Sequence, residues 1–262
     1  MTDTSLSSPT NVIEAVRGAH RERPAADRDA AVWLRDELDQ RLRETLSGYT
    51  FEQPLRLRAS SLRGAVTTGD DSSPFGRLRG VAISTLARLR AHGVAVDRPF
   101  DDALAVMSVD RPGPVREALD QLDDHDVARL AADVEAHYVT LARCLPGIAS
   151  SWRPRTAVRT RVRVAEGRLE LNDVADIVIG SVNGERAALG VLDVTSAPLG
   201  PDEERVLRYH ALTTTLRCEI APLRVSVLST ATGEHWTLDV DRAVLSRAVD
   251  DLANVLTVKE PA

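Results

Sequence analysis

The chain has 262 residues, with 33 lysine and arginine residues against 39 aspartate and glutamate residues, for a formal net charge of -6. Only one of the basic residues is a lysine, Lys259, and the other 32 are arginines. A P-loop, a Schiff-base lysine and a lysine general base are therefore excluded from the body of the chain. The acidic balance argues against a globally basic nucleic-acid binder, and an aromatic content of 3% argues against a base-stacking platform.

Apolar residues recur at helical spacing through most of the first 145 residues. After a tail rich in serine and threonine, this periodicity predicts helices over residues 11–22, 27–46, 76–92, 100–106, 115–122 and 126–144. A short extended stretch is expected over residues 51–62, where leucine and arginine alternate. Pro74 and Gly93 stand where a helix would begin and end.

From residue 156 onward the hydrophobic period changes from 3.6 to 2, which predicts strands. The expected strands cover residues 156–165, 168–171, 174–179, 187–194, 223–229 and 235–240, with helices over 203–217 and 242–256. Asn183-Gly184 is a typical hairpin turn, so the strands on either side of it should pair antiparallel. The sequence thus predicts a mixed α/β (α+β) fold with an N-terminal helical region.

Two acids interrupt strands that are otherwise apolar, Asp176 and Asp193. An ionised carboxylate in such a strand is costly unless it is paired or bound to a metal. If the two strands form the predicted hairpin, the acids could sit side by side, and with a backbone carbonyl they would suit Mg²⁺ or Mn²⁺. Such a site can activate water and clamp a phosphodiester. The alternative is that both acids end their strands and face solvent or pair with arginine.

This order of elements, with acids on the second and third strands, resembles the core of the PD-(D/E)XK nuclease superfamily. The resemblance is to its RecB-like branch, which includes a group of similarly sized actinobacterial proteins. The matching pieces are Asp173-Val174-Ala175-Asp176-Ile177, Leu192-Asp193-Val194-Thr195 and Tyr209-His210-Ala211-Leu212, with shorter upstream matches at residues 57–62, 76–83 and 152–155.

The resemblance runs from about residue 52 to residue 256 and implies a restriction-endonuclease-like αβββαβ core with a mixed sheet. It divides the chain into a tail and helical extension over residues 1–51, a helical part over 52–150 and an α/β core over 151–258. It also implies that Asp176, Asp193 and the carbonyl of Val194 bind Mg²⁺ or Mn²⁺. Asp176, Asp193 and Thr195 then occupy the catalytic positions.

The sequence departs from the family pattern at three of these positions. The catalytic lysine of the family falls on Thr195, its helix histidine on Gly80, and the glycine that opens its second strand on Asp173. No other lysine can replace the missing amine. An arginine cannot act as the base, because its guanidinium group keeps its proton. The two acids are present, but the lysine and the histidine that accompany them in the family are absent, which predicts an impaired or inactive nuclease.

Arginines supply the candidate contacts to DNA. Arg159, Arg161 and Arg163 share one strand face and are interpreted as a phosphate-contacting stripe, although an outer strand with a solvated face would look the same. On the following helix, the resemblance implies DNA contacts by Tyr209 and by Arg205, one turn earlier. For Arg205 the alternative is a surface ion pair with its helix neighbours.

We therefore expect a RecB-like protein that acts on or binds DNA, with weak or absent metal-dependent hydrolysis. The alternative is a non-catalytic interaction module that retains the fold and meets a protein partner through the helices within residues 11–46. Two distant cysteines, Cys144 and Cys218, and the lack of a long apolar run or a signal-peptide segment lead us to expect a cytoplasmic protein with no membrane span.

Overall fold

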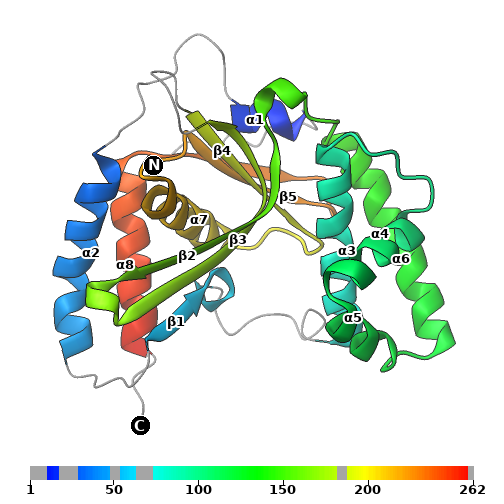
Figure 1. Cartoon of the computed structure of the whole chain (residues 1–262), viewed down its shortest axis with the longest axis horizontal. Helices are drawn as coiled ribbons and strands as arrows, with labels where there is room; N and C mark the ends of the chain where they lie inside the picture. Colours follow the sequence, from blue (N-terminus) through cyan, green and yellow to red (C-terminus); the bar gives the residue numbers. More distant parts are fainter. Residues whose placement is uncertain (1–10, 18–28, 48–53, 63–72, 182–187, 259–262) are drawn as a thin grey trace.

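A six-stranded mixed sheet runs through the protein between two groups of helices (Figure 1). The computed structural model describes residues 11–17, 29–47, 54–62, 73–181 and 188–258. The strands are β1 (Leu55–Arg58), β2 (Arg155–Val164), β3 (Leu169–Ser181), β4 (Ala188–Thr195), β5 (Arg224–Ser229) and β6 (His235–Asp239). This is the α+β fold that the change of hydrophobic period predicts.

The sheet is built around the long, curved strand β3 (Figure 1). Strand β2 pairs with one edge of β3 in an antiparallel ladder, whereas β1 and β4 share the other edge. Strand β1 is parallel to β3 and β4 is antiparallel to it. Beyond β4 follow β5, which is parallel to it, and β6, which is antiparallel to β5. The predicted chain order of three antiparallel strands, a helix and a further strand is confirmed, and the structure shows that this further strand, β5, is parallel to β4.

The helices form two groups on opposite sides of the sheet (Figure 1). Within the described residues, the α-helices are α1 (Val12–Arg17), α2 (Ala30–Ser47), α3 (Pro74–Ala91), α4 (Pro99–Asp110), α5 (Pro112–Leu119), α6 (Asp124–Cys144), α7 (Glu203–Cys218) and α8 (Arg242–Val258). Helices α2, α7 and α8 share one hydrophobic core, and α1 and α3 to α6 share a second core. No helix in the described parts of the chain is both long and apolar enough to cross a membrane.

The apolar faces of the N-terminal helices are used inside the chain. Leu34, Leu38 and Leu42 of α2 are fully buried in the same core as β3 and α7. Val12 and Val16 of α1 are buried in the second core. A protein partner would therefore have to contact the exposed sides of these helices.

The two short strands predicted over residues 168–171 and 174–179 are one continuous strand, β3. Asn172 and Asp173 suggested a break, but β2 pairs with β3 from Leu169 to Val178 and carries the strand across them. The carboxylate of Asp173 is satisfied within the fold, as described below. The predicted turn at Asn183-Gly184 lies outside the described residues, although β3 and β4 pair antiparallel as far as Ser181 and Ala188.

Candidate metal and nucleic-acid site

Four residues of β3, numbers 173 to 176, lie between two ladders on the same edge of the strand. The β1 ladder ends where Arg58 pairs with Asn172, and the β4 ladder begins where Leu192 pairs with Ile177. On the β2 side, Ala157 falls opposite Asp176 and has a positive φ of 49°, so that ladder is distorted at the same place. This opening in the sheet gives Asp173 and Asp176 room to meet polar groups from other elements.

Asp176 and Asp193 meet at this opening. Continuing the antiparallel register by one step places them opposite each other, and their side chains are joined by a hydrogen bond. Asp176 Oδ2 also accepts the backbone N–H of Val194 at 2.9 Å, and Oδ1 accepts the hydroxyl of Ser84 from α3. Burial, followed by the charge of Asp193, raises the pKa of Asp176 well above its usual range. The contact between the two carboxyl groups therefore disfavours the ionisation of both at once.

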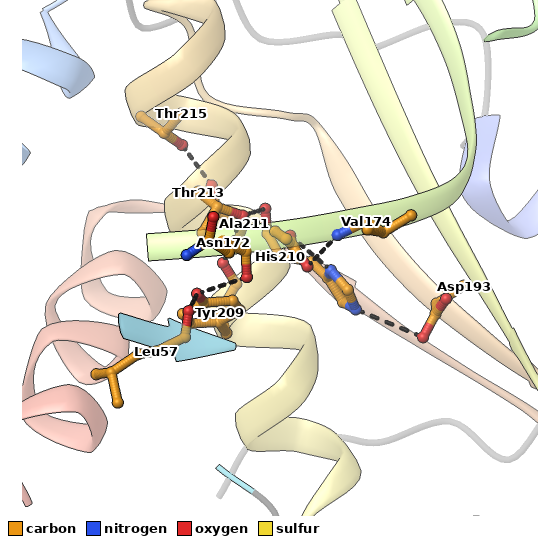
Figure 2. Close-up of polar contacts among 10 residues, drawn as sticks. Leu57, Asn172, Val174, Asp193, Tyr209, His210, Ala211, Thr213 and Thr215 are labelled. Atoms are coloured by element: carbon orange, nitrogen blue, oxygen red, sulfur yellow. Dashed lines mark hydrogen bonds and ion pairs between the residues drawn. The ribbon is translucent and has the colours of Figure 1, made fainter. Parts of the chain in front are cut away.

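His210 of α7 lies between Asp173 and Asp193, and Figure 2 shows its ring pointing toward Asp193. Its Nδ1 lies 2.9 Å from Asp173 Oδ2, and its Nε2 lies 3.5 Å from Asp193 Oδ2. Thr213, one turn along α7, donates its hydroxyl to the same oxygen of Asp173 at 2.6 Å. Burial alone would lower the pKa of His210, but the charges and hydrogen bonds of Asp173 and then Asp193 outweigh it and hold that pKa well above its usual value. The two acids thus favour the protonated form of the buried imidazole that stands between them.

A cleft of about 670 Å³ leads from the protein surface to Asp193, Asp173 and His210. Its outer walls carry four arginines, Arg56 and Arg58 from β1 and Arg159 and Arg161 from β2. The cleft is therefore lined by four exposed arginines around Glu170 and, further in, by Asp173, Asp193 and His210.

The predicted stripe of Arg159, Arg161 and Arg163 is exposed on β2. The sequence around it contains no acid, but the fold brings in Glu170 from β3. Glu170 is paired with Arg161, with Arg163 at 3.4 Å and with Arg56 of β1 at 3.4 Å. The hydrogen bond from Arg161 is the main cause that lowers the pKa of Glu170 from 4.5 to about 2. The stripe is thus a solvated face held in place by an acid, and its interpretation as a phosphate-contacting surface stays a prediction.

Two of the predicted DNA contacts are placed elsewhere. Tyr209 is buried, and its hydroxyl donates to the carbonyls of Leu57 and Asn172 at 3.0 Å each, so the prediction that it contacts DNA is wrong (Figure 2). The ring instead fixes β1 and β3 onto α7. Arg205 donates to Asp202, three residues earlier, at 3.1 Å, which is the kind of neighbouring pair named as its alternative. It also lies 4.0 Å from Asp251 of α8.

The third predicted catalytic position, Thr195, ends β4. Its hydroxyl accepts the backbone N–H of Ala197 at 3.2 Å, and its carbonyl accepts the N–H and hydroxyl of Thr230. The side chain therefore stabilises the turn after β4. The backbone of the preceding residue, Val194, faces the opposite way. Its N–H points to Asp176, and its carbonyl points to the same side, because the N–H and carbonyl of a strand residue lie on one side of the strand.

Motif matching gives no functional role to three residues of this network, namely Ser84, Asp173 and His210. In the sequence, Asp173 is only a departure from a family glycine, and His210 is only part of a matching piece. A signal was present in the spacing, because His210 and Thr213 are three residues apart on one helix face. What the spacing could not reveal is that this face turns toward β3.

The oxygen atoms at this site meet the ligand requirements of a divalent cation only in part. Asp176, Asp193 and the carbonyl of Val194 would supply three oxygens, the ligand type that Mg²⁺ and Mn²⁺ prefer. Among the residues described, no group of three or more His, Cys, Asp or Glu side chains could hold a metal ion. Any site here therefore depends on two carboxylates, the backbone and water.

Comparisons with known proteins yield no family. No family model and no curated protein matches the chain. Among solved structures, one described as "Crystal structure of SSO0001" covers 87% of this chain and 87% of its own, at 12% identity and a TM-score of 0.32. A likeness at that level carries no argument about fold or function.

Proposed function

We propose that this protein binds DNA at the arginine-lined cleft and retains a weak phosphodiester hydrolase site that uses Mg²⁺ or Mn²⁺, in the manner of a degraded RecB-like PD-(D/E)XK nuclease. The observation that carries the proposal is the direct contact between Asp176 and Asp193, of which Asp193 lines that cleft. Two carboxylates in contact inside a protein are costly, and a divalent cation would offset that cost.

In this proposal each residue of the site has a separate role. Asp176 and Asp193 hold the ion with the carbonyl of Val194, and Ser84 orients the carboxyl of Asp176. The bound ion would polarise the phosphodiester and activate water. His210 places a positive charge beside Asp193, but it is committed to Asp173 and does not replace the missing lysine as a water-activating group. The free cysteines are compatible with the cytoplasm as the site of action.

The first test is metal binding, followed as the shift in melting temperature on adding Mn²⁺. We expect the wild type to be stabilised and the Asp176→Asn and Asp193→Asn variants to lose the shift, because each removes one of the two carboxylate ligands. Asp120→Asn, an exposed acid at the end of α5, is the control and should keep it. A wild type that Mn²⁺ does not stabilise contradicts the metal site.

The second test restores the missing amine. Thr195→Lys should increase Mn²⁺-dependent cleavage of labelled DNA by at least about tenfold over the wild type, since a general acid–base group typically contributes more than that. Asp193→Asn combined with Thr195→Lys should abolish the gain. Equal cleavage by Thr195→Lys and the double variant would mean that the activity comes from elsewhere.

The second candidate is the non-catalytic interaction module. The observation that favours it is the imidazolium of His210, which lies 3.5 Å from Asp193 and competes with any cation for that carboxylate. Absence of a Mn²⁺ shift together with absence of DNA retention at low salt would leave this candidate.

A further inference from the structure

A histidine lies on the apolar face of α6, outside the cleft. His137 stands between Val134 and Leu141 at helical spacing, and all three side chains are buried. An apolar residue would suit this position, whereas a histidine there needs a polar partner, because an unpaired buried polar atom is costly. Its Nδ1 lies 2.9 Å from the hydroxyl oxygen of Thr230, which is also buried. The helix thus makes a specific polar contact with the turn that follows β5.

The direction of the hydrogen bonds follows from the hydrogens available. The hydroxyl of Thr230 donates to the carbonyl of Thr195 at 3.0 Å, so its oxygen is left to accept from His137. Burial is the main cause that lowers the pKa of His137, so the imidazole is neutral near pH 7 and has one N–H to donate. Its other nitrogen, Nε2, lies 3.8 Å from Asp133, beyond hydrogen-bond distance. Two hydrogen bonds in series therefore run from His137 through Thr230 to Thr195.

The turn after β5 holds the backbone at the end of β4. The carbonyl of Thr195 also accepts the backbone N–H of Thr230 at 2.9 Å, and the hydroxyl of Ser229 donates to the carbonyl of Ala197 at 2.8 Å. These bonds continue the parallel ladder of β4 and β5, which ends where Thr195 pairs with Ser229. His137 therefore contacts the residue that holds the last carbonyl of β4.

The end of β4 carries two of the three proposed metal ligands. Asp193 and Val194 come immediately before Thr195, and successive residues of a strand direct their backbone groups to opposite sides. Thr195 directs its carbonyl toward β5, so Val194 directs its N–H and carbonyl toward β3, where Asp176 accepts that N–H at 2.9 Å. Holding the carbonyl of Thr195 on one side of β4 therefore holds the carbonyl of Val194 on the other.

We propose that His137 and Thr230 are positioning residues of the candidate metal site. By holding the end of β4, they keep the carbonyl of Val194 and the carboxylate of Asp193 directed toward Asp176. This inference rests on the proposed function for the identity of the ion, and it gives α6 a part in the site. Neither residue contacts the ligand oxygens directly. Replacing groups that orient metal ligands typically weakens metal affinity by about 10- to 100-fold.

The test compares four variants of the full chain and one control with the wild type. His137→Leu and Thr230→Val each break the series of hydrogen bonds, and each puts an apolar side chain of similar size into a buried position. His137→Asn and Thr230→Ser are the conservative variants, because an asparagine amide can donate from the place of Nδ1 and a serine keeps the hydroxyl. The control is Thr215→Val, which removes a buried hydroxyl that donates to Ala211 within α7.

The first measurement is the Mn²⁺ concentration that gives half of the full shift in melting temperature. We expect this midpoint to rise about tenfold in His137→Leu and Thr230→Val. It should stay within about twofold of the wild type in His137→Asn, Thr230→Ser and Thr215→Val. An unchanged midpoint in the first two variants would overturn the inference, and a lower melting temperature beside it would mean that their role is only structural.

The second measurement needs no metal. It follows hydrogen–deuterium exchange of the peptide covering residues 192–198 by mass spectrometry in EDTA. Loss of one hydrogen bond should speed exchange there about fivefold in His137→Leu and Thr230→Val, with the conservative variants and the control unchanged. Equal exchange in all variants would also refute the inference. Faster exchange in a protein that Mn²⁺ does not stabilise would support the positioning of β4 by His137 and Thr230 and reject the metal site of the proposed function.

Discussion

Asp173 and His210 show how a buried ion pair can be satisfied from several directions. The carboxylate receives the imidazole of His210 and the hydroxyl of Thr213, and Asp173 Oδ1 accepts the backbone N–H of Val174. Both side chains are almost completely buried. Removing one partner of such a pair leaves a desolvated charge without compensation.

We predict that Asp173→Ala lowers the free energy of unfolding by about 3 kcal/mol or more, measured by urea denaturation at neutral pH. Thr213→Val, which removes one hydrogen bond to the same carboxylate, should cost about 1 kcal/mol. A loss in Asp173→Ala no larger than in Thr213→Val would mean that the pair does not stabilise the fold.

Glu170 provides a pH-dependent contribution to stability with a definite sign. Its pKa in the folded protein is about 2, below its usual value of 4.5, so ionisation favours the folded state. That stabilisation is present above pH 4.5 and is lost as the pH falls toward 2. We predict that Glu170→Gln has a lower urea midpoint than the wild type at pH 7, and that the two midpoints converge between pH 4.5 and pH 2. A difference independent of pH would contradict the assignment.

At the scale of elements, the close approach of α1 to β4 depends on a glycine. A Cβ on Gly190 would lie 2.5 Å from Val16 Cγ1 and 3.1 Å from Ile179 Cγ1. The sequence predicts α1 from its periodicity and β4 from its apolar run, but nothing in either pattern says that they touch. Gly190 therefore permits a tertiary contact that the sequence patterns alone do not predict.

We predict that Gly190→Ala destabilises the protein by about 1–3 kcal/mol through overpacking. Because the clash is with Val16, the double variant Gly190→Ala/Val16→Ala should be less destabilised than the sum of the two single variants, measured by a thermodynamic cycle in urea. Additive effects would show that α1 does not pack on β4 in solution.

At the scale of the whole molecule, one sheet serves two hydrophobic cores. Val178 and Val191 pack into the core of α2, α7 and α8, whereas Ile177 and Leu192 pack into the core of α3 to α6. Neighbouring residues of the same two strands thus belong to different cores. If either group of helices separated from the sheet, the other core would therefore be exposed as well.

We predict one cooperative unfolding transition. Trp33 packs on the first core and Trp152 on the second, so variants that retain only one of these two, with Trp236 of the first core also replaced, should report the same urea midpoint by fluorescence as the intact chain does by far-ultraviolet circular dichroism. Separate midpoints would instead support independent units, as in the division of the chain at residues 51 and 150.

Periodicity and composition by themselves determined most elements of this protein, with the unbroken strand β3 as an exception, because a period of 3.6 or 2 is a local property of the chain. They also identified Asp176 and Asp193, since a carboxylate within an apolar strand is conspicuous in one dimension. Tertiary structure alone decided which groups share an environment. It buried Tyr209, brought Glu170 under the arginines, joined Asp173 to His210 and added Arg56 and Arg58 from a distant strand. The physical reason is that charge, burial and hydrogen bonding depend on neighbours in space, and here the neighbours come from β1, β3 and α7, which are far apart in sequence.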